Sequence, residues 1–485
     1  MSWLDDAISW ISPQWGAKRI AYREYSKELQ RFYDAGIGKR LNENWSAIGA
    51  SGEETDKYNR DIIRNRARDL ERNSDIANSV LNAIERNVIG AGFVLRAKTP
   101  DAELNKSIEK LWKRWSKARN CDVTGTQSFM EMMRMAIVRK KVDGGILIKK
   151  CYTDGGMMRF KLQTIEVDEI DSTATGQHGD NKIVSGIEYN KYNKIVGYWI
   201  KQYDVDGWQI NKSQYVPAKD MIFLFTKRRP SQIREMSDLT HVISRVRDAN
   251  EYMTAISVKE RITACLAVFI KKALPVNTGR INTNSSGDYA GKRLSPGMIQ
   301  ELNPGDDVQV VNPSGQATDS AGMIQLHQRM IGAGLGLSYE TTSRDMSHSN
   351  YSSARQGAIE DELTYKKDKE KLIETVFDEV YETFLIQAWL EGLLNIPDFW
   401  ERKMDYMEHE WVGIPKPWVD PIKEANANKT AVSSGVKTYQ QICAEQGYDW
   451  KRNIDEIAEA AAYATEKGIS LEEVIYGKKI GNDDT

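Results

Sequence analysis

The sequence predicts an α+β fold with unusually long helices, and three observations support this prediction. Short runs rich in Val, Ile, Tyr and Phe, bounded by Gly, Asn, Asp or Pro, recur between residues 146 and 225 and predict strands. An apolar stripe at helical spacing then continues from Leu239 to Ile262 without Gly or Pro. Only Gly357, and no Pro, interrupts the run from Ser352 to Gly392, which predicts a helix about 60 Å long.

Composition and charge exclude several classes of protein. Hydrophobic residues make up 40% of the chain and charged residues 28%, which is typical of folded, water-exposed domains. The net charge of −2 provides no global basic field, so any contact with DNA must be local or loose. No apolar run approaches the roughly 18–20 residues of a membrane span, and Asp5 and Asp6 argue against a secretory signal. The four cysteines form no CxxC pair, which disfavours a zinc site or a disulfide framework and favours a reducing compartment.

The first half of the chain predicts an arm, several helices and then strands. One helical face near the N-terminus is apolar and needs a partner surface. Residues 62–89 predict one or two helices that end at Gly90 and Gly92. Asp143-Gly144-Gly145 predicts a turn into the first strand. The apolar face comprises Trp3, Leu4, Ala7, Ile8 and Ile11, the further helices are 104–118 and 129–142, and the strands are 146–152, 182–189, 196–203 and 221–225.

The second half predicts two helices around a small module, then a polar loop and the longest helix. Ser237 is a plausible cap for the first helix. Residues 264–318 are rich in Gly and Pro and carry two apolar patches, 266–270 and 308–311, which suggests a loop-rich β module. The next helix meets Gly332, Gly334 and Gly336, where a break or a close backbone approach is expected. After a Pro-rich stretch, 415–421, residues 438–475 predict short helices.

The longest helix divides into two halves. Its second half carries Leu372, Val376, Phe377, Val380 and Phe384 on one face, which is typical of a core. Residues 360–371 are mostly charged and are predicted to be surface or interface. The preceding loop, 341–350, is polar with Met346 as its single hydrophobic side chain, so something other than its own packing must fix it.

A search for catalytic patterns gives no candidate. The five histidines show no HExxH spacing, and Gly287 to Lys292 departs from a phosphate-binding loop. Acidic strings usually mark solvated turns rather than cation sites, and a tryptophan pair at helical spacing more often packs in a core than stacks on bases. We therefore expect no catalytic residue, no metal and no cofactor. The acidic strings are Asp168, Glu169 and Asp171, and Asp306 with Asp307, and the tryptophans are Trp112 and Trp115.

A long and specific resemblance covers most of residues 64–475. The stretch from Gly332 to Glu340, followed by Asp345-Met-Ser-His-Ser-Asn350-Tyr-Ser-Ser-Ala-Arg355, resembles the phage portal proteins of the lambda-like family. The chain departs from that family's pattern at Asp143-Gly-Gly145, where the family tends to have Asp-Gly-Glu, and at 231–235, where it tends to have Gly-Gln-x-Arg-Gly. Further support comes from Arg72-Asn73, Asn87 to Gly92, Trp112, Trp115, Gly186 to Glu188, Gly197 to Trp199 and Val216 to Ala218.

The resemblance implies a portal-type subunit in a twelve-membered ring, where neighbouring subunits supply packing for the long helix and the polar loop. Its parts would be an N-terminal arm, an α/β wing, long stem helices, a small β-containing clip, a channel loop and a helical crown. By position these are arm 1–55, first part of the wing 56–236, stem helix 237–263, clip 264–318, stem helix 319–336, channel loop 337–351, wing spine helix and return 352–425, and crown-like C-terminal module 426–485.

The resemblance also implies a function and a set of site residues. The ring would sit at one capsid vertex, where the terminase large subunit packages double-stranded DNA through it and head–tail adaptor proteins later dock. Other implied partners are the major capsid protein and the scaffolding protein, with assembly in the host cytoplasm and no membrane. The competing interpretations are another phage head component and a metal-dependent nuclease. The channel loop residues would be Ser343, Arg344, Asp345, His348, Ser349 and Asn350, the stem wall Lys259 and Arg261, and the clip docking residues Pro275, Lys292, Arg293 and Pro304.

Overall fold

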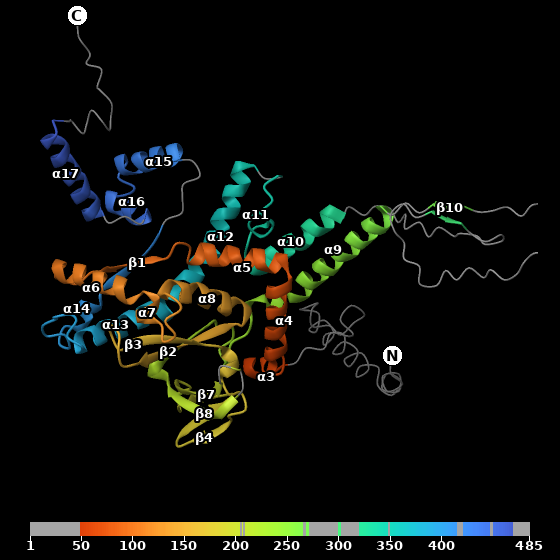
Figure 1. The fold of residues 1–485 in the computed structure, drawn as a ribbon, viewed down its shortest axis with the longest axis horizontal. Coiled ribbons are helices and arrows are strands. Elements are labelled where there is room, and N and C mark those ends of the chain that lie inside the picture. Colours follow the sequence, from red (N-terminus) through yellow and green to blue (C-terminus); the bar gives the residue numbers. More distant parts are fainter. Residues whose placement is uncertain are drawn as a thin grey trace, which may run out of the picture. The chain divides into compact units, whose positions relative to one another are not determined.

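The computed structural model divides the chain into two units, 1–55 and 56–485, and the fold below is that of the second unit (Figure 1). The predicted apolar face at residues 3–11 lies outside the described residues. Within the described part of the chain, no helix has the length and apolarity needed to cross a membrane. The structure describes residues 49–203, 206, 209–264, 268–270, 299–301, 320–347, 350–414, 421–446 and 450–468.

The helices predicted between residues 62 and 142 are present. A break at Ser74 separates the first two, because its side chain accepts a hydrogen bond from the Ala77 amide and caps the second. Ser128 and Glu131 form a capping box at the start of the last helix. These helices are α4 (Arg60–Asn73), α5 (Asp75–Val88), α6 (Ala102–Trp115) and α8 (Phe129–Val142). Two short helices, α3 (Gly52–Asp56) at the end of the first unit and α7 (Ala118–Cys121), were not predicted.

A three-stranded antiparallel sheet separates two hydrophobic clusters. It has the order β3-β2-β9, with β2 (Gly145–Tyr152), β3 (Phe160–Ile165) and β9 (Met221–Phe225). Successive side chains of a strand point to opposite faces, so Ile146 and Ile148 enter the cluster shared with α8, whereas Leu147 enters the other cluster. The central strand is therefore buried on both faces.

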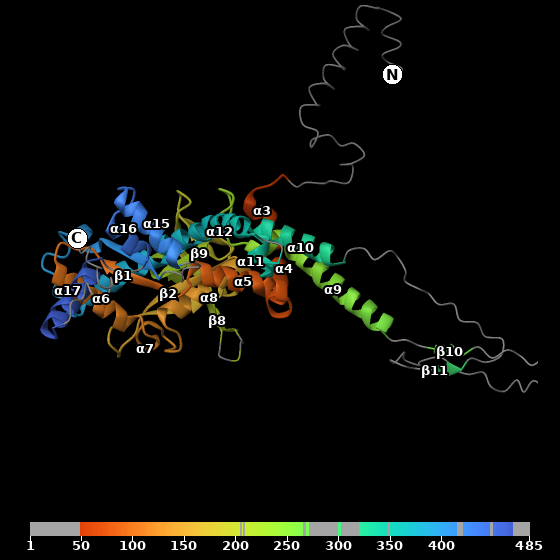
Figure 2. The ribbon, with the colours of Figure 1, turned by 90° about the horizontal axis from the view of Figure 1, so that it is seen from above.

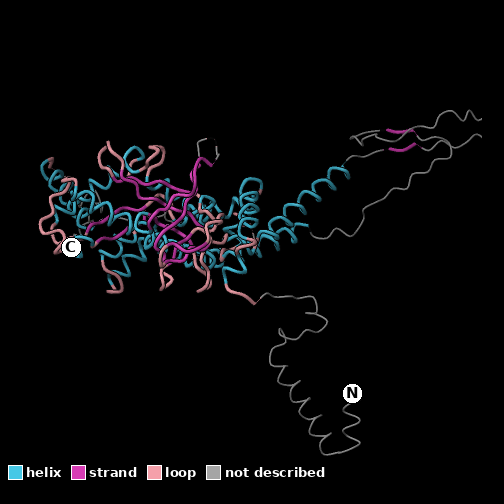
Figure 3. Tube along the Cα trace, turned by 90° about the horizontal axis from the view of Figure 1, so that it is seen from below, coloured by secondary structure: helices cyan, strands magenta, loops and turns pink. Residues whose placement is uncertain are grey.

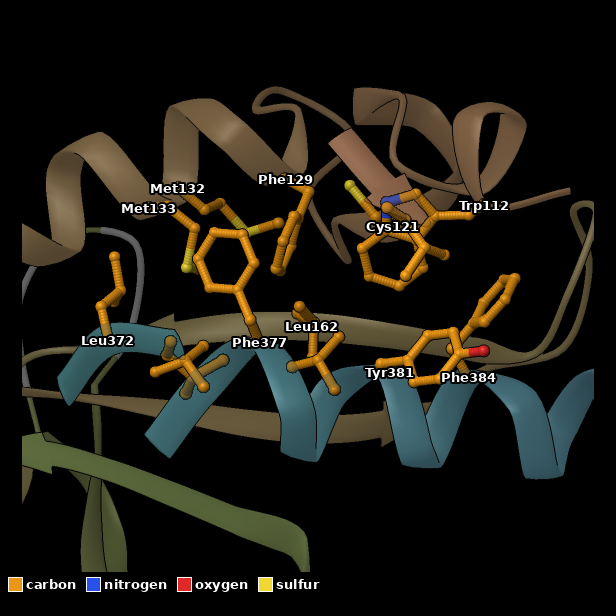
Figure 4. Close-up of a cluster of buried hydrophobic side chains, with 14 of the residues drawn as sticks. Trp112, Cys121, Phe129, Met132, Met133, Leu162, Leu372, Phe377, Tyr381 and Phe384 are labelled. Carbon is orange, nitrogen blue, oxygen red and sulfur yellow. The ribbon is translucent and has the colours of Figure 1, made fainter. Parts of the chain in front are cut away.

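The cluster beneath α8 contains the predicted tryptophan pair. Trp112 and Trp115 are 4% and 0% exposed, so packing rather than base stacking is their role. The Trp115 indole N–H donates to the Phe160 carbonyl over 2.9 Å, which satisfies its polar atom. Figure 4 shows Phe129, Met132 and Met133 of α8 facing Phe377 and other side chains of the longest helix.

A five-stranded antiparallel sheet packs on the face of the three-stranded sheet that points away from α8. The side chains between the two sheets form the second hydrophobic cluster, which contains Leu147. The predicted strand 182–189 is split by a turn at Ser185 and Gly186, both of which have positive φ (48° and 81°). Short helical turns η3 (Val167–Glu169) and η4 (Ala218–Asp220) flank the sheet. Its strands, in order, are β4 (Gly176–His178), β5 (Asn181–Val184), β6 (Ile187–Tyr189), β7 (Ile195–Tyr203) and β8 (Gln209–Pro217).

Two further strand pairs join distant segments. β1 (Phe93–Ala97) pairs antiparallel with β12 (His409–Gly413), and β10 (Val268–Ile270) pairs parallel with β11 (Ile299–Glu301). The second pair is the described part of the module predicted at 264–318, and the apolar patch at 308–311 lies outside the described residues.

The helices that precede and follow that module in the sequence, α9 (Ile243–Ala264) and α10 (Ser320–Leu335), run side by side (Figure 2, Figure 3). Ser237 caps a separate turn, η5 (Asp238–His241), and not the long helix as predicted, because its hydroxyl accepts from the Leu239 amide over 3.2 Å. The first part of α9 packs on α4, α5 and α10 through Val246 and Ala249. From Thr254 to Arg261 its side chains are mostly exposed.

The longest helix spans 351–390 and contains one π-helical turn, which the sequence pattern did not predict. It consists of α12 (Tyr351–Leu372), the π turn η6 (Ile373–Phe377) and α13 (Asp378–Leu390). The predicted core face of the second half is confirmed, since its five apolar side chains are fully buried. The charged half differs from expectation because Asp361, Tyr365 and Asp368 are also buried.

The remaining helices follow β12 and its neighbour α14 (Lys403–Met407). α16 (Tyr439–Glu445) and α17 (Trp450–Glu466) lie in the range predicted to form short helices, whereas α15 (Pro421–Ser433) was not predicted. Asn453 of α17 donates to the Tyr439 hydroxyl of α16 over 3.1 Å, which joins the last two.

Candidate functional site

The loop after α10 begins with a tight helix ending. Gly336 has a φ of +70°, and the Leu337 amide donates back to the Gly332 carbonyl over 2.9 Å, as in a Schellman motif. A Cβ on Gly336 would lie 2.9 Å from Oγ1 of Thr364 on α12, and that hydroxyl donates to the Gly336 carbonyl. The break and the close backbone approach predicted for this glycine cluster are confirmed.

The first part of the predicted loop is a short helix, α11 (Tyr339–Ser343). Ser338 caps it by accepting a hydrogen bond from the Thr341 amide over 3.3 Å. Arg344 ends it in the left-handed conformation, with φ at +57°, and its amide donates to the Glu340 carbonyl. The polar composition of this segment had indicated an irregular loop, because Ser and Thr are modest helix formers.

Asp361 of α12 holds the start of α11. Its carboxylate accepts from the Ser338 amide (2.6 Å), the Ser338 hydroxyl (2.8 Å) and the Thr341 hydroxyl (2.6 Å). The residue is only 2% exposed, so these bonds form away from water, where hydrogen bonds to a charged group are strongest.

Two further contacts fix the same segment. The Ser79 hydroxyl of α5 donates to the carbonyl of buried Thr342 over 2.8 Å. A Cβ on Gly357 of α12 would lie 3.2 Å from Cβ of Ser338, so the two backbones approach closely. Other elements of the same chain therefore hold residues 338–343, which agrees with the expectation that something other than the loop's own packing fixes it. Packing of the loop by ring neighbours stays a prediction.

The second part of the loop is organised around Asp345. Its carboxylate accepts from the Tyr339 hydroxyl (3.1 Å) and from the amide (2.9 Å) and hydroxyl (2.5 Å) of Ser347. Burial, together with the Asp345 carboxylate, raises the pKa of Tyr339. Met346 is 58% exposed, so it is no hydrophobic anchor.

The predicted DNA-contacting residues differ in what their side chains do. Arg344 is exposed. Ser343 donates to the Tyr339 carbonyl over 2.8 Å, and Asn350 caps α12 by accepting from the Ser353 amide over 2.8 Å. His348 and Ser349 lie outside the described residues.

The predicted stem wall and clip residues are distant in sequence from the loop. Lys259 and Arg261 are both exposed near the end of α9, and Arg261 Nε donates to the Ser257 carbonyl over 3.3 Å. The predicted clip residues fall outside the described part of the chain: Pro275, Lys292, Arg293 and Pro304.

A buried cluster of charges joins α12 to α8 and to η5, the turn that precedes α9. Asp368 accepts from Lys140 (2.8 Å) and Lys141 (2.7 Å) of α8, and both ammonium groups also lie 3.1 Å from Asp238 of η5. Burial opposes the ionisation of Asp238, but Lys141 and Lys140 outweigh it and lower its pKa to about 2. The charge cluster thus joins three elements with each charge opposed.

The first acidic string is structural and not a set of solvated turns as predicted. Asp168 pairs with Arg64 (3.0 Å) and Arg68 (2.6 Å), and Asp171 accepts hydrogen bonds from Thr173 and Ser213. In the ranges that the structure describes, no three His, Cys, Asp or Glu side chains gather in a way that could hold a metal ion. Asp306 and Asp307 lie outside those ranges.

The two segments that depart from the family pattern lie against each other. Gly144 has a φ of +91°, and a Cβ built on it would lie 2.4 Å from the Met236 carbonyl carbon. Glu235, which precedes Met236 and is fully buried, pairs with Arg234 (2.9 Å) and Arg64 (3.3 Å). Both departures therefore belong to one tightly packed junction.

Sequence reasoning missed Asp361 and Asp368. Their helix segment is rich in charge, which indicated an exposed surface. The apolar face that begins at Leu372 continues toward the N-terminus at helical spacing, through Asp368, Tyr365 and Asp361. This spacing could have placed both aspartates on the inner face of the helix.

Comparison with known proteins identifies the family. The profile of the family described as phage portal protein, lambda family, matches residues 38–368. A probable portal protein of Halomonas phage phiHAP-1 is 27% identical over 446 residues, covering 87% of this chain and 84% of the relative. Portal protein B of Escherichia phage lambda is 21% identical over 431 residues, covering 80% of each chain.

A solved structure is also similar, although weakly. It is the neck of a native gene transfer agent particle computed with twelve-fold symmetry, which is 12% identical and covers 79% of this chain and 93% of the other. The TM-score of 0.42 is too low to carry the symmetry of that particle over to this chain. The family assignment rests on sequence: the chain belongs to the lambda family of phage portal proteins.

Proposed function

We propose that the chain forms a twelve-membered ring at one vertex of the capsid, through which double-stranded DNA enters and later leaves. Membership of the portal family supports this proposal most directly. The parts keep the ranges that the resemblance implies, with α9 and α10 as stem helices, the 337–351 segment as channel loop and the 351–390 helix as wing spine.

Exposed apolar side chains on the long helices support ring formation. Met323, Leu326 and Met330 recur at helical spacing on α10 and are 39%, 49% and 44% exposed. Ile359 and Leu363 do the same on α12. Apolar side chains in rows of this kind mark a surface that another protein covers, and a neighbouring copy would cover it in a ring.

The channel loop is the proposed DNA contact. Each Lys or Arg held on a phosphate adds salt-sensitive affinity that would slow a sliding duplex. A loop with one exposed cation, Arg344, among short polar side chains suits transient contact. Ser343, Asp345, His348, Ser349 and Asn350 complete the proposed contact set, and Lys259 and Arg261 the stem wall.

The proposed partners follow from the same family role. The terminase large subunit and then the head–tail adaptor would dock on the clip, through Pro275, Lys292, Arg293 and Pro304. The major capsid and scaffolding proteins would hold the ring in the virion after its assembly in the host cytoplasm. The role is structural, so we propose no catalytic residue and no cofactor.

Replacement of the exposed part of the loop tests this proposal. Exchanging residues 344–349 for Gly and Ser keeps Ser338 to Ser343 and the Asn350 cap intact. We expect rings to assemble as in the wild type, while packaged or retained DNA falls at least tenfold in infected cells. The matched control replaces the exposed β6–β7 turn, 191–193, in the same way and should package normally.

The alternatives give different results in this experiment. Unchanged packaging by the loop variant would contradict the channel role and favour another head component. DNA cleavage by the purified wild-type chain with Mg²⁺ would instead favour a nuclease.

A further inference from the structure

We propose that Asp361 is a positioning residue for the channel loop. Its carboxylate would fix residues 338–341 to α12, so that residues 344–347 meet DNA from a base of constant position. This inference rests on the proposed function of the loop, but its structural half can be tested separately.

The carboxylate of Asp361 depends on the loop for its solvation. All three of its hydrogen bonds come from Ser338 and Thr341, and none of these donors is a cation. A charge that is 2% exposed loses most of its hydration, and the loop donors replace it. Movement of residues 338–341 away from α12 would leave the carboxylate buried without these partners, so the charge resists such movement.

Helix α11 depends on Asp361 in turn. A helix of five residues cannot form by itself, because nucleation costs more than so few hydrogen bonds return. Ser338 accepts from the Thr341 amide and donates to Asp361 with the same hydroxyl, so the cap and the anchor are one hydrogen-bonded unit. Asp361 therefore orients the residue that starts α11.

The other end of this arrangement is fixed as well. Asp368 lies on the same face of α12 as Asp361, two turns further on, and pairs with Lys140 and Lys141 of α8. The position of Asp361 is thus set relative to α8 and to the base of α9. The loop inherits that position through three short hydrogen bonds.

Hydrogen–deuterium exchange on the full chain tests the anchor. Asp361→Asn and the isosteric Thr341→Val should each raise exchange at the amides of 338–343 at least tenfold. The first variant removes a carboxylate oxygen that accepts hydrogen bonds, and the second removes the Thr341 hydroxyl that donates one. Thr341→Ser keeps the hydroxyl and should restore wild-type exchange. The control is Thr383→Val, which removes a buried hydroxyl that donates to the Glu379 carbonyl in α13, away from the loop.

Exchange in 338–343 that stays at the wild-type rate in both Asp361→Asn and Thr341→Val would overturn the anchor. Because Thr341 is only half-buried, Thr341→Val still gives this answer where Asp361→Asn does not fold. In packaging assays, both variants should retain several-fold less DNA than Thr341→Ser. Faster exchange with unchanged DNA retention would overturn the link between loop position and DNA, while the anchor stands and the channel role is judged by the loop replacement alone.

Discussion

At the scale of single residues, two buried aspartates on one helix face have different kinds of partner. Asp361 is surrounded by hydroxyl and amide donors, whereas Asp368 lies against two lysines. The sequence could not reveal either role, because the donors are distant in the chain and become neighbours only through the packing of α8, α11 and α12. By contrast, the burial of Trp112 and Trp115 was predictable from helical spacing alone.

Removal of the Asp368 charge should be strongly destabilising. Asp368→Asn leaves Lys140 and Lys141 with one carboxylate between them, and breaking a buried pair costs about 3 kcal/mol or more. Urea unfolding of the purified chain measures this. Glu370→Gln is the control, since its pair with Lys366 is exposed and should contribute little. Equal midpoints for the two variants would contradict the role of the charge cluster.

Acid should weaken the same cluster through Asp238. Its pKa is lowered from 3.8 to about 2, so ionised Asp238 stabilises the fold above its unfolded pKa, and this contribution is lost as pH falls through about 2. The thermal midpoint should therefore fall from pH 5 to pH 2 with a steeper slope in the wild type than in Asp238→Asn. Asp405→Asn, in an exposed pair with Arg402, should keep the wild-type slope, and parallel slopes for all three chains would refute this prediction.

At the scale of elements, periodicity located most of the described helices and about half of the described strands, and several of the differences have local causes. Helices α4, α5, α6, α8, α9 and α10 and strands β2, β7 and β9 lie where apolar spacing and turn residues placed them. The π turn at 373–377, the short α11 and the split between β5 and β6 were not predictable in this way. Each depends on a hydrogen bond or a positive φ at one or two residues, which a pattern over ten or more residues averages out.

The junction between the β2 turn and η5 gives a prediction at this scale. Gly144→Ala would require an L side chain at φ +91° with its Cβ 2.4 Å from the Met236 backbone, so we expect a loss of about 2 kcal/mol or more. Gly125→Ala is the matched control, because φ is also positive (+71°) but no atom lies within 4 Å. Gly125→Ala should lower the free energy of unfolding by only about 1 kcal/mol, through backbone strain. Chemical unfolding of both variants measures the difference, and equal losses would show that the close packing at Gly144 contributes nothing.

At the scale of the whole molecule, family membership and exposed surface point to the same assembly. The sequence resemblance to portal proteins is confirmed by the family match over residues 38–368. The long helices carry apolar side chains on α10 and α12 that are not covered within the described part of the chain. Such rows are costly to leave in water, and the proposed assembly of like copies would cover them.

The mass and shape of the assembled protein test this account most directly. We would express the full chain with its scaffolding protein, purify it and measure its native mass, with electron microscopy of the same sample. The account predicts closed rings of about twelve subunits, with the 337–351 segment facing the central opening. Monomers alone, over a range of salt and Mg²⁺ concentrations and with scaffold present, would contradict it.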